Sequence, residues 1–253
     1  GNHDTKWSES GCTDFLKLWG NDRFVFEFDK FLFIGLHQGP RMRMADGHWA
    51  PEDLRWYDSL IVSLPNSNQP IIFITHYPID EEIANWYEML DRLKNVNTQV
   101  VLFGHGHTNK IYDFETIPGI MGRSNLRAHK IIGGYTIVEF KSDSIYFSER
   151  TPNTETKLWH QLPLQQRNYE ALMFEQTRPN YSINEKYPEV KSVWEFNSGY
   201  TIGSSAMVKD NSVFVGDASG YFYSLSLSNG SVNWKYKTQN AIYSTPAVKC
   251  KSV

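Results

Sequence analysis

Histidines in three short segments carry the chemistry that this sequence could perform. The chain begins with Gly1-Asn2-His3-Asp4, His76 follows an apolar run, and Gly104-His105-Gly106-His107 holds two histidines two residues apart. Imidazole nitrogens bind transition metals, and the side-chain oxygen of an asparagine can bind a hard cation. A histidine can also give a proton to a reacting group. Together the three segments predict a metal site with acid–base chemistry.

Taken alone, His105 and His107 leave two interpretations open, because histidines at strand ends are often only hydrogen-bonded. The flanking glycines are expected to let the backbone turn sharply and to bring both imidazoles toward one point. His76 favours the metal interpretation, since it too follows an apolar strand and ligands gather at the carboxyl ends of strands in α/β sheets.

The elements that must position these histidines alternate between strands and helices. Unbroken β-branched and aromatic runs predict buried strands that end directly before His76 and Gly104. A hairpin is expected upstream, and two amphipathic helices separate the strands. This alternation predicts a layered α/β domain over residues 1–163. The predicted hairpin strands are 24–28 and 31–36, and the two predicted buried strands are 70–75 and 100–103. One predicted helix begins at Pro51, and a second runs through residues 83–93.

The sequence pattern changes after the predicted α/β domain. Residues 164–190 are polar without a sustained period and predict a linker. In residues 191–253 the sequence recurs at an interval of 40, as Trp194 with Trp234 and as Ser204–Val208 with Ser244–Val248. Short strands at this period are typical of a β-propeller blade, and about one and a half blades are expected here.

In order and spacing, the three histidine segments resemble the calcineurin-like metallophosphoesterase family. The resemblance covers about residues 1–150, including Gly47–Trp56 and the strand-like Gly134–Phe140. It implies an α/β/β/α metallophosphoesterase sandwich, incomplete in this chain. It also implies two divalent metal ions, Mn, Fe or Zn, that clamp a phosphoryl group and activate a hydroxide.

The resemblance assigns roles to individual positions. Asn2, His76 and His105 would hold one metal ion, and His107 would reach the other. His3 would be the general acid, or would stabilise charge near the leaving oxygen. Asp4 receives no ligand role, and a hydrogen bond that fixes its loop is expected instead.

The family's Asp-x-His and Gly-Asp motifs should stand before Gly1 and have no counterpart in the sequence. The second metal ion would then keep His107 alone, which cannot hold it tightly. We therefore expect an amino-terminally truncated chain that is inactive or weakly active, derived from a phosphomonoesterase or phosphodiesterase.

The carboxyl-terminal part resembles the PQQ-like propeller repeat in Val213–Gly216, Gly220–Leu225 and Trp234. A Trp-Asp repeat fits less well, because no Trp-Asp pair closes either copy. The resemblance implies no bound PQQ, a surface for a protein partner and, by analogy, an extracytoplasmic location. A second hypothesis follows, in which a degenerate phosphatase fold carries a propeller as a non-catalytic scaffold.

Composition limits the partners. The net charge is −3 and no long run has one sign, which argues against a nucleic-acid or anionic-membrane binder and favours a small or locally charged substrate. The resemblance to the phosphoesterase family implies that this substrate is a phosphate ester. No apolar stretch reaches the roughly 18 residues of a membrane-spanning helix. Cys12 and Cys250 lie too far apart in sequence to indicate a redox compartment.

Further polar residues leave alternatives open. His37 could line a pocket or have a structural role, and Arg41 and Arg43 could contact a substrate phosphate or lie in a solvated loop. Surface or packing roles are expected for the histidines without partner segments, which are His48, His129 and His160.

Overall fold

The computed structural model describes most of the chain, and residues 8–12, 40–46, 67, 126–131, 170–177 and 250–253 lie outside it. The expectations for Cys12, Arg41, Arg43, His129 and Cys250 fall on residues that are not described. Within the described ranges, every helix is too short or too polar to span a bilayer.

The chain divides into two compact units. The first comprises Gly1–Trp49 with Trp56–Gln176, and the second comprises Ala50–Arg55 with Thr177–Val253. Two short helical segments lie outside the layers described below, the π-helical turn η1 (His3–Trp7) and the 3-10 helix η2 (Ser182–Lys186).

A six-stranded sheet forms the centre of the first unit. The inner strands β2, β3, β4 and β6 are parallel, whereas β1 and β5 are antiparallel edge strands. The predicted hairpin and both predicted buried strands are therefore confirmed. In spatial order the strands are β1 (Phe24–Phe28), β2 (Phe31–Gly35), β3 (Ile71–Ile74), β4 (Thr98–Phe103), β6 (Ile117–Met121) and β5 (Lys110–Phe114).

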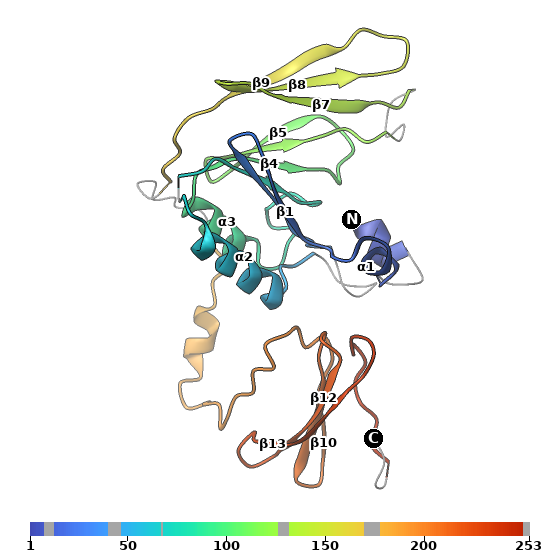
Figure 1. The fold of residues 1–253 in the computed structure, drawn as a ribbon. Helices are drawn as coiled ribbons and strands as arrows, with labels where there is room; N and C mark the ends of the chain where they lie inside the picture. The colour runs from blue at the N-terminus through green and yellow to red at the C-terminus, as the bar shows by residue number, and fades with distance from the viewer. Residues whose placement is uncertain (8–12, 40–46, 67, 126–131, 170–177, 250–253) are drawn as a thin grey trace. The chain divides into compact units, whose positions relative to one another are not determined.

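Helices α2 (Pro51–Ser63) and α3 (Trp86–Lys94) cover one face of this sheet (Figure 1). α2 begins at Pro51, whose missing N–H has no partner to lose in the first helical turn. Its Tyr57 ring meets the β3 ring of Phe73 edge-on at 6.1 Å between centroids. α3 turns its buried residues, Trp86, Met89, Leu90 and Leu93, inward at helical spacing.

A second, antiparallel sheet of β7 (Tyr135–Phe140), β8 (Ser144–Arg150) and β9 (Lys157–Pro163) packs on the opposite face (Figure 1). The described residues thus form three layers of the expected α/β/β/α sandwich, and no described helix covers the outer face of the second sheet. Both sheets contribute to one apolar core, made of Phe31, Phe33, Ile72, Val100, Ile120, Ile145, Phe147 and Leu162.

The β1 edge of the central sheet is apolar and exposed. All five residues of β1 are exposed, and Phe28 retains 62% of its accessible surface. The ring of Phe26 stacks on Phe33 of β2 at 4.7 Å between centroids. Helix α1 (Thr13–Trp19) also exposes apolar side chains, with Leu18 78% exposed.

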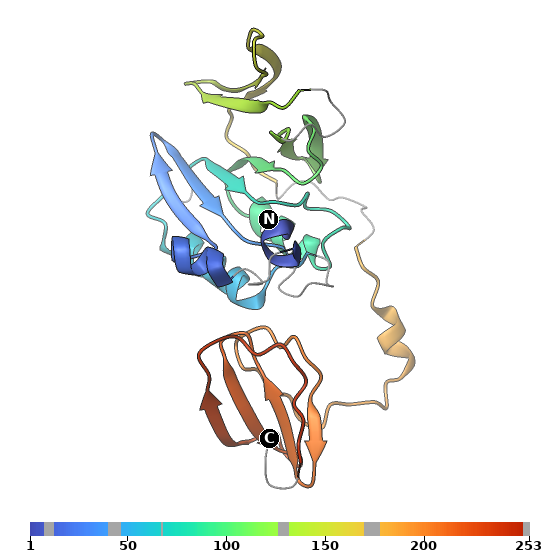
Figure 2. The ribbon, with the colours of Figure 1, turned by 90° about the vertical axis from the view of Figure 1, so that its right-hand side faces the viewer.

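The second unit holds a four-stranded antiparallel sheet, whose strands lie side by side in Figure 2. The number of strands agrees with the four expected in one 40-residue repeat. In the second unit, the described residues form this one sheet and no closed ring of propeller blades. The strands are β10 (Met207–Lys209), β11 (Ser212–Gly216), β12 (Tyr221–Ser226) and β13 (Val232–Lys237).

Residues that recur at the 40-residue interval make contacts in this unit. The Trp194 indole N–H donates to the Leu227 carbonyl at 2.8 Å. The Trp194 ring lies against Gly230, where an added Cβ would come within 2.5 Å of the ring. The backbone N–H of Ser205 donates to the hydroxyl of Thr245 at 3.3 Å, 40 residues away. The two copies of the repeat are therefore in contact.

Candidate metal centre

The carboxyl ends of β3 and β4 place His76 and His105 side by side. Strand-like hydrogen bonds continue past both strand ends, from Thr75 N–H to the Leu102 carbonyl at 3.0 Å and from Gly104 N–H to the His76 carbonyl at 3.1 Å. These bonds hold the two loops together. The imidazole centroids are 5.3 Å apart and the ring planes meet at 74°.

The amino-terminal segment brings Asn2 to the same place. The Asn2 side-chain oxygen lies 2.8 Å from Nε2 of His76. The buried hydroxyl of Thr5 donates to the Asn2 carbonyl at 3.1 Å and fixes the turn. The Asp4 carboxylate accepts from the Gly1 ammonium, and this hydrogen bond lowers the Asp4 pKa.

The environment keeps the His76 imidazole neutral. Burial lowers the pKa of His76 to about 4, and the positive charges of the amino terminus and of His105 act in the same direction. The neutral imidazole is the form that binds metals. A charge on His3 also lowers this pKa, so His3 lies within electrostatic range of His76.

The chemistry of these donors fits one divalent metal ion. Asn2, His76 and His105 offer one oxygen and two imidazoles, which suit Mn, Fe or Zn. Within the described ranges, no group of three or more His, Cys, Asp or Glu side chains is placed to hold a metal ion. The His107 carbonyl accepts a hydrogen bond from Ser124 N–H at 3.3 Å. No described contact links its imidazole to His76.

The sharp turn after β4 lies on the histidines themselves. His105 has φ 64° and His107 has φ 60°, whereas Gly104 and Gly106 do not adopt positive φ. The expectation that the glycines would supply the turn is therefore wrong in this detail. A left-handed conformation costs a non-glycine residue of the order of 1–2 kcal/mol. Such strained residues cluster at functional sites.

Replacing His105 by glycine should give a more stable protein than replacing it by alanine. Glycine adopts positive φ without a Cβ clash, so the difference in unfolding free energy should be about 1 kcal/mol in favour of His105→Gly. Chemical denaturation of the two variants measures it.

His160, in the middle of β9, provides the control for this pair. At position 160 the alanine variant should be more stable than the glycine variant, because glycine weakens a strand. His105→Ala equal to or more stable than His105→Gly would contradict the strain argument.

Gln38 is a site residue that the sequence reasoning missed. Its side chain is fully buried, and its Oε1 accepts from the Thr75 hydroxyl, from His76 N–H at 2.9 Å and from Tyr77 N–H at 2.7 Å. One side-chain oxygen therefore sets the backbone that carries His76. Gln38 follows the strand β2, as His76 follows β3, and that shared position is the sequence signal for it.

Asn109, two residues beyond His107, anchors the second histidine loop. Its amide donates to Glu149 at 2.6 Å, and its oxygen accepts from Arg123 N–H at 2.9 Å and from the Thr136 hydroxyl at 2.8 Å. The nearly buried Arg123 guanidinium donates to Glu149 at 2.9 Å. This network connects the histidine loop to β7 and β8 of the second sheet.

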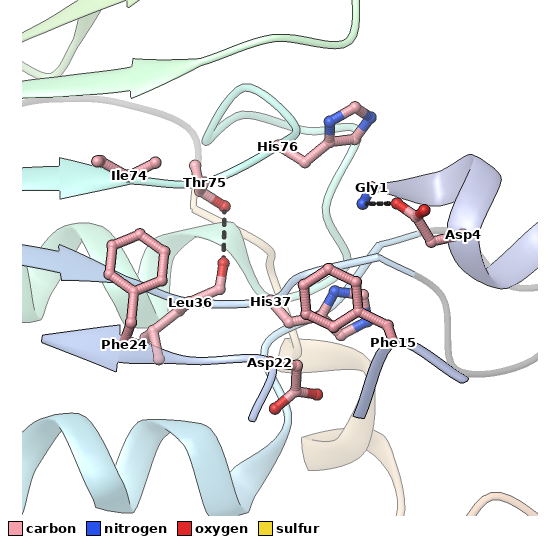
Figure 3. Close-up of a pocket in the computed structure, with 10 residues that line it drawn as sticks. All are labelled: Gly1, Asp4, Phe15, Asp22, Phe24, Leu36, His37, Ile74, Thr75 and His76. Carbon is pink, nitrogen blue, oxygen red and sulfur yellow. Dashed lines mark hydrogen bonds and ion pairs between the residues drawn. The ribbon is translucent and has the colours of Figure 1, made fainter. Parts of the chain in front are cut away.

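The other candidates divide between the site and the core. Tyr77 packs against His105 at 4.3 Å between ring centroids, and His37 lines a cavity beside His76 (Figure 3). His48 donates its backbone N–H to the Gln38 carbonyl at 3.1 Å. The His160 ring lies 5.8 Å from the Phe147 ring and 5.9 Å from the Trp159 ring between centroids, and burial lowers its pKa.

Comparisons with solved structures gave distant similarities. Vps29 of Entamoeba histolytica in complex with zinc has 12% identity and a TM-score of 0.29, over 57% of this chain and 62% of Vps29. A predicted phosphoesterase from Streptococcus pneumoniae has 14% identity and a TM-score of 0.28, over 55% of this chain and 61% of that one. The chain therefore spans about three fifths of each. GAP50 of Plasmodium has 14% identity and a TM-score of 0.36, over 58% and 55%.

Comparison with curated proteins gave no match. The family model described as calcineurin-like phosphoesterase matches residues 1–109, which is less than half of the chain. The matched range contains Asn2, His76, His105 and His107. The family match therefore supports a calcineurin-like metallophosphoesterase domain in this part of the chain.

Proposed function

We propose that the protein hydrolyses a phosphate ester with the help of divalent metal ions. The observation that carries this proposal is the convergence of Asn2 with His76 at 2.8 Å and of His76 with His105 at the carboxyl edge of the central sheet. The family match over residues 1–109 supports the same reaction class.

In the proposed site, Asn2, His76 and His105 hold one metal ion and His107 belongs to a second. A bound divalent metal supplies a Lewis acid and lowers the pKa of a water molecule. His3 gives a proton to the leaving oxygen. Gln38 fixes the backbone of His76, and Asn109 fixes the loop of His107.

For the second unit we propose a surface for a protein partner. Its four antiparallel strands within a 40-residue recurrence support one blade of a PQQ-like propeller, which would offer a surface to a protein partner. An extracytoplasmic location is proposed with it, by analogy alone.

One observation favours the non-catalytic scaffold as a second candidate. Among the described residues, the metal centre contains fewer than three His, Cys, Asp or Glu side chains. A catalytic metal site usually has three protein ligands. In the scaffold, the amino-terminal unit would only carry the second one.

Hydrolysis of bis(4-nitrophenyl) phosphate distinguishes the two candidates. The protein is assayed with Mn²⁺ or Zn²⁺ and after treatment with a chelator. Metal-dependent release of nitrophenol supports the enzyme, and release at a normal rate would overturn the expectation of an inactive or weakly active chain. No release with either metal would overturn the enzyme and favour the scaffold.

A further inference from the structure

A cavity of about 150 Å³ lies directly beside the candidate metal centre, and His76 is part of its wall (Figure 3). Phe15 of α1 and Phe24 of β1 contribute aromatic side chains, and Leu36 and Ile74 line it at the ends of two neighbouring strands. The wall is therefore mainly apolar, although a metal centre alone would require only polar groups.

The sequence keeps the Phe24 ring close to the sheet. This ring lies over Gly35 of β2, where an added Cβ would come within 2.2 Å of it. Any larger residue at position 35 would displace the aromatic wall. Phe24 also stacks on Phe26 at 6.0 Å between centroids, which helps to hold its orientation.

The size of the cavity limits its occupant. An engineered protein cavity of about this size accepts benzene, so a volume of about 150 Å³ is large enough for one aromatic ring. Aromatic walls favour an aromatic occupant through offset or edge-on ring contacts. One six-membered ring fits this volume.

The charges around the cavity limit the occupant further. Asp4 and Asp22 are both in its wall, the Gly1 ammonium in the same wall pairs with Asp4, and no Lys or Arg is among the described residues that line it. The two carboxylates outnumber the one ammonium, so a second anionic group on the ligand would be repelled. The ring should therefore be uncharged.

We propose that this cavity binds the alcohol part of the substrate as a single uncharged aromatic ring, next to the phosphate at the metal centre. This inference rests on the proposed phosphoesterase function. It narrows the substrate class to aryl or arylmethyl phosphate esters.

The ring site can be tested separately from hydrolysis with 4-fluorophenol, whose binding is followed by ¹⁹F NMR. Phe24→Ala and Phe15→Ala should each weaken binding about tenfold, because each substitution removes an aromatic ring from the cavity wall that would contact the ligand ring. Phe28→Ala on the same strand and Leu18→Ala on the same helix are matched controls, because neither residue lines the cavity. The anion 4-fluorobenzoate should bind more weakly than 4-fluorophenol.

The outcomes separate the inference from the function on which it rests. No binding of 4-fluorophenol, or equal losses in Phe24→Ala and Phe28→Ala, would overturn the ring site. In the hydrolysis assay, the KM for phenyl phosphate should be at least about tenfold below that for methyl phosphate, and equal KM values would overturn the ring site alone. Ring binding without hydrolysis of any phosphate ester would instead refute the phosphoesterase function.

Discussion

His76→Ala should weaken the binding of Mn²⁺ or Zn²⁺ by at least about 100-fold and lower phosphate-ester hydrolysis by orders of magnitude. Loss of a group that only orients a metal ligand already costs about 10- to 100-fold, and His76 offers the ligand nitrogen itself. His105→Ala should have the same effect, because its imidazole stands 5.3 Å from that of His76 at the same edge. Isothermal titration with each metal measures the affinity, and hydrolysis of bis(4-nitrophenyl) phosphate measures the rate.

The matched control is His160→Ala. This histidine of β9 lies near the rings of Phe147 and Trp159, outside the candidate metal centre, so metal affinity and hydrolysis should stay at the wild-type level. Circular dichroism checks that all three variants fold. Equal and mild losses in all three would show that the metal centre has been assigned to the wrong residues.

Gln38→Met should destabilise the protein by about 3 kcal/mol. Methionine keeps the size of the side chain but removes the oxygen that accepts from Thr75, His76 and Tyr77. Each buried donor left without an acceptor costs about 1–3 kcal/mol. Chemical denaturation measures the loss. Hydrogen exchange at the His76 amide should also accelerate, because this amide loses its acceptor.

Two variants make the Gln38 experiment specific. Gln38→Glu keeps an acceptor at the same position and should recover part of the lost stability. Gln69→Met removes a surface side chain whose amide donates to Glu27 at 3.3 Å, and it should change stability by less than about 0.5 kcal/mol. A loss in Gln38→Met no greater than that in Gln69→Met would disprove the structural role of Gln38.

Periodicity in the sequence predicted the elements that surround the candidate metal centre. The apolar runs before His76 and Gly104 became β3 and β4, and Pro51 begins α2 as expected. These features are local, because burial on both faces of a strand and the geometry of a first helical turn both leave a direct trace in residue type.

The contacts that refine the site could not be found in this way. Gln38 and Asn109 act through hydrogen bonds to residues about 15 to 40 positions away in sequence, and no local pattern records such a partner. The cavity wall is equally non-local, since Phe15 and Ile74 line the same cavity although they are far apart in sequence. The four strands of the second unit were expected from the repeat, whereas closure into a ring depends on contacts between blades, which a single sheet does not provide.

The backbone conformation of His105 and His107 has a consequence for how this sequence can change over evolutionary time. Selection for stability alone would replace both histidines by glycine or asparagine, the residues that accept positive φ most readily. A lineage that loses its chemistry should therefore drift toward those residues at these two positions. Sequences of natural variants can reveal such a change without any assay, because histidine is favoured over glycine or asparagine at these positions only where the imidazole is needed.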